Sequence, residues 1–231
     1  MKALVLFSGG LDSTVCLAMA VHQYGADEVL ALSVYYGQRH KKELEAAARV
    51  ARYYGVRQIT LDLGEIFKGS SCSLLEGSAE NIPTGDYSEQ LEKTKGAPVS
   101  TYVPFRNGLF LSSAASVALS HGCEVIYYGA HADDAAGNAY PDTSAAFNEA
   151  ISRAIHLGSG NALTVLAPFI DKPKAQVVAV GHELRVPFEQ TWSCYEGHAK
   201  ACGVCGTCRD RKLAFRLNGL KDPIPYENEE A

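Results

Sequence analysis

The sequence lacks the features of a membrane, secreted or nucleic-acid-binding protein. No apolar run is long enough to cross a bilayer, and the apolar segment that begins at Ala3 leaves no room for a signal peptide. Basic residues are not in excess, since the net charge is −5, which disfavours a general nucleic-acid-binding surface. We therefore expect a cytoplasmic globular protein that binds neither membranes nor nucleic acid.

Two common phosphate-binding motifs are also absent. No Gly-x-x-x-x-Gly-Lys-Ser/Thr segment is present, which excludes a Walker A loop, and no Gly-x-Gly-x-x-Gly segment is present, which excludes the dinucleotide fingerprint. A phosphate site in this chain must therefore use another kind of loop.

The segment Ser8–Thr14, Ser-Gly-Gly-Leu-Asp-Ser-Thr, has the composition of such a loop. It lies between an apolar run over residues 3–7, typical of a buried parallel strand, and a helical pattern that begins at Val15. The first amides of a helix lack internal partners and favour an anion. Gly9 and Gly10 let the backbone approach a phosphate closely. The alternative is a turn that only caps the helix.

Strand and helix patterns alternate along the chain. Further strands are expected over residues 28–36, 57–63, 124–129 and 163–166, and helices over residues 43–54, 108–120, 144–156 and 175–184. Asn107 is expected to cap the helix that follows it. The alternation predicts an α/β fold, a doubly wound, mostly parallel five-stranded sheet of Rossmann-like type. The polar segment 64–100 interrupts it, as a lid or mobile binding loop or as a disordered insertion.

Polar side chains follow two of these strands, where ligands bind in open α/β sheets. The segment Tyr36–His40 follows the second strand and Asp134 the fourth. We expect the loop that contains Asp134 to share one crevice with Ser8–Thr14. Carboxylates are preferred ligands of Mg²⁺, so Asp12 and Asp134 are candidates to hold this ion.

Four cysteines, Cys194, Cys202, Cys205 and Cys208, have the spacing Cys-x7-Cys-x2-Cys-x2-Cys. Four thiolates suit a structural tetrahedral zinc site with no open position for water, and this use of cysteine fits a reducing cytoplasm. An iron–sulfur cluster is the alternative. The ferredoxin run has a further cysteine three residues after the last one, whereas Arg209–Lys212 follows here.

Five segments in order resemble one enzyme family: Ser8–Thr14, Tyr36–His40, Val103–Asn107, Tyr140–Asp142 and the four cysteines. The first is similar to the pyrophosphate loop of the PP-loop, or N-type, ATP pyrophosphatases. The whole set resembles the 7-cyano-7-deazaguanine synthases of the pathway to queuosine and archaeosine. The resemblance implies an adenine nucleotide α-hydrolase-like ATP-binding catalytic domain over residues 1–186 and a zinc-binding appendage over residues 187–231.

The resemblance implies an ATP-dependent ligase. The carboxylate of 7-carboxy-7-deazaguanine attacks the α-phosphorus of Mg-ATP, and ammonia then displaces AMP to leave an amide. A second ATP activates the amide oxygen, and loss of AMP gives the nitrile. Adenylation supplies the leaving group both times, so one ATP site can serve both steps. The resemblance also implies a homodimer, and the chain has no glutaminase domain, so free ammonium is the expected nitrogen source.

The resemblance assigns roles residue by residue. Those implied for ATP binding are Phe7, Ser8, Gly9, Gly10, Leu11, Asp12, Ser13 and Thr14. Those implied for substrate binding are Tyr36, Gln38, Arg39, His40, Arg106, Asn107, Tyr140 and Asp142. Those implied for catalysis are Asp12, Arg39, Arg106 and Asp134.

Several of these residues have two interpretations. Arg39 and Arg106 suit a phosphate or a carboxylate, or else each forms a surface ion pair. His40 and His131 are candidates for proton transfer or for structural roles. Asp142 is expected to accept hydrogen bonds from the guanine-like edge of the substrate.

The chain departs from the family pattern in the expected substrate loop. Thr143–Ser144 replaces the usual Cys-Arg, Asn138 and Ala139 look inserted, and Phe105 stands where glycine is common. Either Tyr36 or Phe105 is expected to stack on the heterocycle. These departures bear on the substrate loop more than on the ATP site.

Two other functions remain open on the residues. A PP-loop enzyme that thiolates or amidates a tRNA base would need a basic face or an RNA-binding domain, and the acidic chain offers neither plainly. A nucleotide-binding regulatory module would have little use for Asp12, Arg106 and a zinc appendage together. Assay of the nitrile product distinguishes the three.

Overall fold

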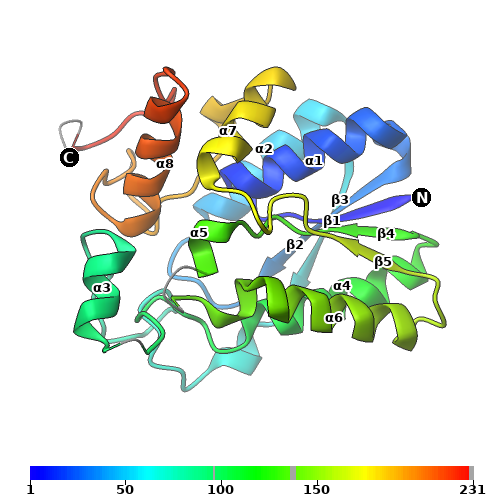
Figure 1. Ribbon diagram of the computed structural model, residues 1–231, viewed down its shortest axis with the longest axis horizontal. Coiled ribbons are helices and arrows are strands. Elements are labelled where there is room, and N and C mark those ends of the chain that lie inside the picture. The colour runs from blue at the N-terminus through cyan, green and yellow to red at the C-terminus, as the bar shows by residue number, and fades with distance from the viewer. Residues whose placement is uncertain (96, 136–138, 229–231) are drawn as a thin grey trace.

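The computed structural model describes residues 1–95, 97–135 and 139–228. Its centre is a five-stranded sheet (Figure 1). The strands are β1 (Ala3–Leu6), β2 (Val29–Tyr35), β3 (Arg57–Asp62), β4 (Val125–Tyr127) and β5 (Thr164–Leu166). Their order is β3-β2-β1-β4-β5 and every neighbouring pair is parallel. The predicted sheet is therefore confirmed, and all the expected strands belong to it.

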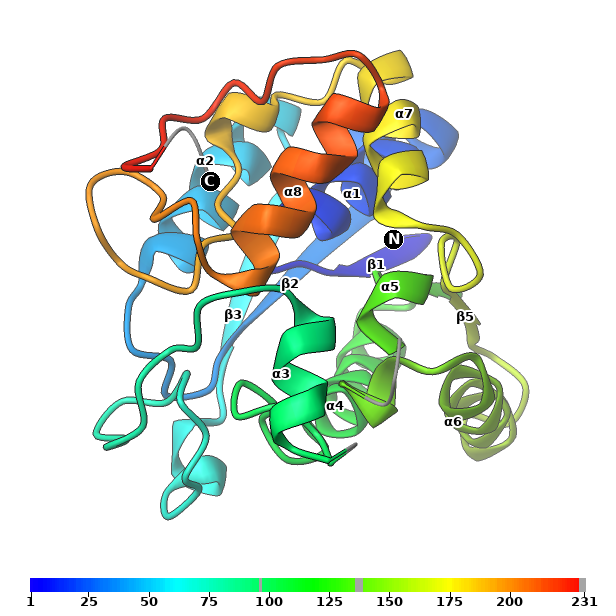
Figure 2. The same ribbon diagram turned by 60° about the vertical axis from the view of Figure 1, so that its left-hand side comes forward.

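Helices cover both faces of the sheet (Figures 1 and 2). One face carries α1 (Leu11–Tyr24), α2 (Lys42–Tyr54), α7 (Lys174–Glu183) and α8 (Gly206–Leu217), and the other carries α4 (Arg106–Ser120) and α6 (Ala145–Gly158). Val5 of β1 packs on the first face and Leu4 on the second. Because both faces are covered, the strand is apolar throughout.

Shorter elements connect these layers. They are the helices α3 (Tyr87–Lys93) and α5 (Ala132–Ala135) and the 3₁₀ turns Ala26–Glu28, Gly64–Phe67, Pro141–Thr143 and Phe188–Gln190. Among the described residues, no helix has the length and apolarity that crossing a membrane requires.

Two helices begin earlier than the sequence indicates. α1 begins at Leu11, so Asp12 lies in its first turn. α4 begins at Arg106, and the expected cap, Asn107, lies inside it; that prediction was wrong. The carboxylate of Asp142 accepts a hydrogen bond from the Asn107 backbone N–H at 2.8 Å and so satisfies this helix end from another loop.

Phe105, the residue before α4, has a φ of 53°, which places it in the left-handed region. Glycine adopts this conformation without a steric penalty. The turn therefore gives a physical reason why glycine is common here in the family. Of the two residues that look inserted, Asn138 lies outside the described residues.

The segment 64–100 is packed against the rest of the molecule. Its Cys72, Leu74 and Leu75 are buried with Tyr36, and Leu75 forms a bridge with Gln38. The prediction of a disordered insertion was therefore wrong. Its buried residues follow neither helical nor strand periodicity, so the sequence pattern gives no indication of their burial.

The C-terminal segment contacts the predicted phosphate loop directly. The backbone N–H of Trp192 donates to the carbonyl oxygen of Gly9 at 3.0 Å. Within α8, Arg211 is fully buried, and its guanidinium forms a two-point ion pair with Asp222 at 2.7 and 3.0 Å. No sequence pattern indicated α8. The domain boundary after residue 186 stays a prediction.

Candidate active site

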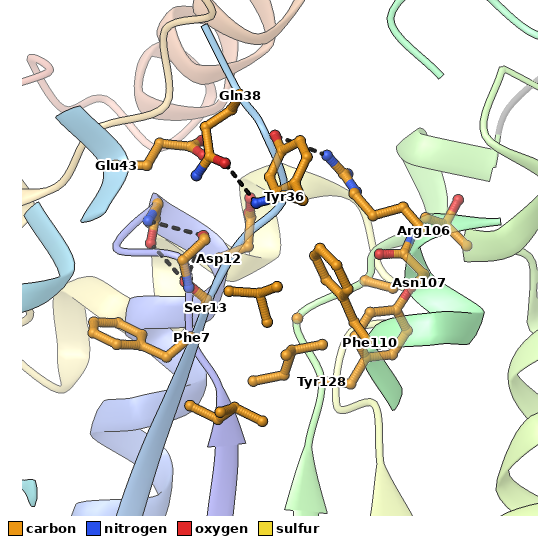
Figure 3. A pocket seen from close by; sticks show the side chains of 18 of the residues that line it. Phe7, Asp12, Ser13, Tyr36, Gln38, Glu43, Arg106, Asn107, Phe110 and Tyr128 are labelled. Carbon is orange, nitrogen blue, oxygen red and sulfur yellow. Dashed lines mark hydrogen bonds between the residues drawn. The ribbon is translucent and has the colours of Figure 1, made fainter. Parts of the chain in front are cut away.

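A cavity, here called the main cavity, opens at the carboxyl ends of β1, β2 and β4 (Figure 3). The strand order reverses between β1 and β4, and open α/β sheets bind ligands at such a point. The predicted site residues that line it are Phe7, Ser8, Gly10, Asp12, Ser13, Tyr36, Gln38, Arg106, Asn107 and Asp134. The crevice expected from the sequence is therefore formed by these residues.

Hydroxyl groups hold the loop between β1 and α1 in shape. The backbone N–H of Ser8 donates to Ser13 Oγ at 3.2 Å, and the N–H of Gly10 donates to Ser8 Oγ at 3.1 Å. Thr14 Oγ1 donates to the Gly10 carbonyl at 2.8 Å and is fully buried. Ser8 and Ser13 therefore face the cavity, whereas Thr14 supports the loop from behind.

Gly9 lies where α2 approaches the loop. Its φ is 82°, and a Cβ atom there would lie 2.3 Å from the backbone nitrogen of Ala47. Both its conformation and its surroundings therefore require glycine. Together with Leu11, whose N–H points to Ser193 Oγ at 3.5 Å, Gly9 shapes the loop without lining the cavity.

Asp12, in the first turn of α1, forms an ion pair with Lys174 of α7. Lys174 Nζ lies 2.8 Å from Asp12 Oδ2, and Lys174 is 6% exposed. Burial raises the pKa of Asp12, but Lys174 and His131 outweigh it, so this pKa lies below its usual value. The other carboxylate oxygen, Oδ1, is buried without a hydrogen-bond partner. It is therefore free to bind a ligand.

His131 and Asp134 complete this charged group. His131 is 1% exposed, and its Nε2 lies 3.1 Å from Lys174 Nζ and 3.4 Å from Asp134 Oδ1. Asp134 lines the main cavity. The carboxylates of Asp12 and Asp134 therefore fit the oxygen-rich coordination that Mg²⁺ requires beside phosphate.

Arg106 and Tyr36 lie at the opposite end of the main cavity (Figure 3). Arg106 Nη1 donates to the Tyr36 hydroxyl at 3.3 Å, and its guanidinium lies 5.2 Å from the Tyr36 ring centroid. Tyr36 is fixed in turn by Phe67 and Phe110. Arg106 is thus a cation in the lining of the main cavity, whereas Lys174 lies behind Asp12 near the loop.

Glu43, in the first turn of α2, also lines the main cavity, and the sequence did not indicate it. Burial raises its pKa to about 7, opposed by Arg106 and reinforced by Cys194. A carboxylate of this kind is half protonated near neutral pH, so it can exchange a proton there.

Four of the residues predicted to bind the substrate lie outside the main cavity. Arg39 donates to the backbone carbonyls of Ser78 and Glu80 in the segment 64–100. His40 Nε2 lies 2.9 Å from the Tyr195 carbonyl oxygen. Both residues line a second, smaller cavity, here called the small cavity. Arg39 is thus engaged with the protein's own backbone.

Tyr140 and Asp142 face inward as well. The Tyr140 hydroxyl lies 2.6 Å from Thr101 Oγ1 and 3.0 Å from the Tyr195 hydroxyl. Asp142 is 3% exposed and uses both carboxylate oxygens for Asn107. Through these contacts Tyr140 and Asp142 support the surroundings of the main cavity without lining it. Thr143, the next residue in the sequence, lines it.

The four cysteines form one buried cluster, with all sulfurs within 4.8 Å of one another. Cys202 and Cys208 lie 4.0 Å apart, close to the edge of about 3.8 Å of a tetrahedron with Zn–S bonds of about 2.3 Å. Backbone N–H groups of Glu196 and Cys202 point to the Cys194 sulfur, each at 3.3 Å. The donor set therefore fits a structural metal.

Comparison with known proteins identifies the family of the chain. The family model "Queuosine biosynthesis protein QueC" matches residues 2–219. The chain belongs to the QueC family. A protein named 7-cyano-7-deazaguanine synthase from Archaeoglobus fulgidus is 40% identical over 230 residues, 99% of this chain and 92% of that protein. One of the same name from Methanosphaerula palustris is 43% identical over 231 residues, 98% and 100% of the two chains.

The structure of NMN synthetase from Francisella tularensis has a TM-score of 0.50 and 14% identity, and covers 95% of this chain and 78% of that one. This likeness shows the fold alone. The QueC chain thus has the predicted fold class, and its cysteine cluster lies where the family resemblance placed it.

Besides Glu43, two further residues of this QueC chain were missed by the sequence reasoning. The position of Lys174 could have been noticed in the sequence. A lysine in the first turn of a helix interacts unfavourably with the helix dipole, so its presence there suggests a role other than helix stabilisation. Tyr195, which lines the main cavity, follows Cys194 of the cysteine cluster and gave no such signal.

Proposed function

We propose that this QueC chain converts 7-carboxy-7-deazaguanine, ammonia and ATP to 7-cyano-7-deazaguanine, AMP and pyrophosphate. The observation that supports this most directly is one cavity that joins a pyrophosphate-type loop to an arginine. The loop Ser8–Ser13 lies at one end and Arg106 at the other. Such a cavity suits ATP and a carboxylate that has to meet its α-phosphorus.

In the first step, the amides and hydroxyls of Ser8, Gly10 and Ser13 hold the β- and γ-phosphates. Lys174 supplies positive charge beside them. Asp12 and Asp134 would hold Mg²⁺, which neutralises phosphate charge when bound. Arg106 orients the substrate carboxylate, since a guanidinium fork matches two carboxylate oxygens. The carboxylate oxygen then attacks the α-phosphorus, and pyrophosphate leaves.

In the second step, ammonia attacks the acyl carbon and AMP leaves with the bonding electrons of the C–O bond. The resulting amide occupies the same end of the cavity as the carboxylate did. Its oxygen attacks the α-phosphorus of a second ATP, and pyrophosphate leaves. The C–O bond then breaks, AMP leaves with the former amide oxygen, and nitrogen loses its two protons to give the nitrile. Tyr36 and Phe110 form the apolar wall beside Arg106 and suit a flat heterocycle.

We further propose that the cysteine cluster binds one structural zinc ion. The cluster adjoins Trp192, whose N–H holds Gly9 of the loop. Zinc would thus fix the segment that supports the ATP site. The homodimer and the cytoplasmic location stay predictions from the family resemblance, and light scattering measures the first.

The proposal is tested by incubating the zinc-loaded protein with 7-carboxy-7-deazaguanine, ATP, Mg²⁺ and ammonium. Mass spectrometry should detect the amide and then the nitrile, with AMP formed in parallel. Absence of both products from a folded, metal-loaded protein would overturn the proposal. A tRNA-modifying activity would instead give a mass change in tRNA and none in the free heterocycle.

A further inference from the structure

The carboxylate of Glu43 lies between the main cavity and the small cavity, and the proposed reaction assigns it no role. Both cavities are lined by Glu43, Tyr36, Gln38 and Tyr195. The volume of the small cavity is about 10 Å³, close to the ~10 Å³ that one water-sized molecule requires. The small cavity therefore suits a very small ligand next to the main cavity.

The lining of the small cavity includes two candidate acceptors for a cationic ligand, the Glu43 carboxylate and the His40 ring, together with the donor Arg39. His40 Nε2 lies 2.9 Å from the Tyr195 carbonyl oxygen. A carbonyl has no proton to give, so Nε2 donates, and in the neutral ring Nδ1 is an acceptor. This Nδ1 is buried and has no partner among the described residues. The other charged residue of the lining, Arg39, already donates to two backbone carbonyls.

We propose that Glu43 binds, from the small cavity, the ammonium ion that supplies the product nitrogen, and accepts its proton to release ammonia into the main cavity. The inference rests on the proposed function, because only that reaction consumes ammonia. Ammonium is similar in size to water and has four N–H donors and no acceptor. It therefore matches a small space bounded by a carboxylate and an unpaired imidazole nitrogen.

The position of Glu43 also suits the acyl-transfer step. Glu43 and Arg106 both line the main cavity, with Tyr36 between them in the view of Figure 3, and are close enough for their charges to interact. Arg106 is the group proposed to orient the substrate carboxylate. Ammonia released at Glu43 therefore enters the same cavity as the acyl carbon that it attacks.

Formation of the amide removes two protons from the ammonium nitrogen. Ammonium gives one proton to the Glu43 carboxylate, and the nitrogen lone pair forms the new C–N bond. The C–O bond to AMP breaks, and AMP takes its electron pair. The second proton that the nitrogen loses goes to the released phosphate oxygen, and Glu43 returns its proton to solvent.

The test compares Glu43→Gln with Glu45→Gln, an exposed glutamate on the same helix. Carboxylate-dependent exchange of pyrophosphate into ATP, without ammonium, measures adenylation alone. Amide plus nitrile formed at increasing ammonium concentration measures the nitrogen step. Hydroxylamine is mostly uncharged at neutral pH and converts the adenylated substrate to a hydroxamate. Hydroxamate formation therefore measures acyl transfer that does not depend on an ammonium site.

We expect Glu43→Gln to keep the exchange reaction and hydroxamate formation. We expect its kcat/KM for ammonium to fall roughly a hundredfold, the scale of general-base catalysis, and Glu43→Asp to recover part of this loss. Glu45→Gln should resemble the wild type in all three assays. Wild-type ammonium dependence in Glu43→Gln, or equal losses with ammonium and hydroxylamine, would overturn the inference. If the wild-type protein itself shows no carboxylate-dependent exchange, the proposed function fails.

Discussion

Lys174 Nζ and Asp12 Oδ2 lie 2.8 Å apart, although 161 residues separate them in the sequence. Their ion pair joins the first turn of α7 to the first turn of α1, beside the loop that the proposed function assigns to pyrophosphate. Burial lowers the pKa of Lys174, but Asp12 and Asp134 outweigh this effect and raise it. Lys174 therefore stays charged, and a phosphate next to Asp12 would meet a cation already in place.

We expect Lys174→Met to weaken ATP binding by roughly tenfold to a hundredfold, because a charge-assisted hydrogen bond contributes about 1.5–3 kcal/mol. Titration with ATP and Mg²⁺, followed by calorimetry, measures the change. Lys172→Met is the matched control, since that side chain is 41% exposed. Equal affinities of the two variants would remove Lys174 from the nucleotide site.

We expect Asp12→Ala to abolish turnover while the fold stays intact. The change removes the buried oxygen available to Mg²⁺, whereas His131 and Asp134 still surround Lys174. Nitrile formation measures the first effect and thermal unfolding the second. Asp27→Ala, at an exposed position, serves as control, and near-normal activity of Asp12→Ala would exclude Asp12 from the mechanism.

We expect about one zinc ion per chain, and we expect its removal by a chelator to weaken ATP binding as well as stability. The reason is the contact between Trp192 and Gly9, which joins the cysteine-containing segment to the loop. Metal analysis and ATP titration of the same samples test both effects. Iron with sulfide, or active protein without metal, contradicts the zinc assignment.

We expect Glu43→Gln to be more stable than the wild type above pH 7. The pKa of Glu43 is raised from 4.5 to about 7 in the folded state, so the folded state binds more protons between these values. The free energy of unfolding of the wild type therefore falls as pH rises through this window. The variant keeps its free energy of unfolding there, because glutamine does not titrate. Below pH 4.5 the difference should vanish; a constant difference across denaturant titrations at several pH values would contradict the shift.

The sheet and the phosphate loop could be predicted because their signals are local. Parallel strands buried on both faces are continuous apolar runs, and the Ser8–Thr14 segment needs only its own composition. Other parts depend on distant partners. Asp142 is polar and belongs to the Tyr140–Asp142 motif, which favoured a substrate role, but the backbone N–H of Asn107 at the start of α4 occupies its carboxylate. Lys174 can be recognised as a site residue only once the fold has brought it next to Asp12.

Tyr195 completes the wall of the main cavity and belongs to a segment that is synthesised after all five strands. A chain still on the ribosome with its sheet complete lacks this wall and the support of Trp192 and Ser193 for the loop. The proposed nucleotide site of such a chain is incomplete. We therefore expect nucleotide binding to stabilise the protein only after the cysteine-rich segment has emerged, and not during early folding.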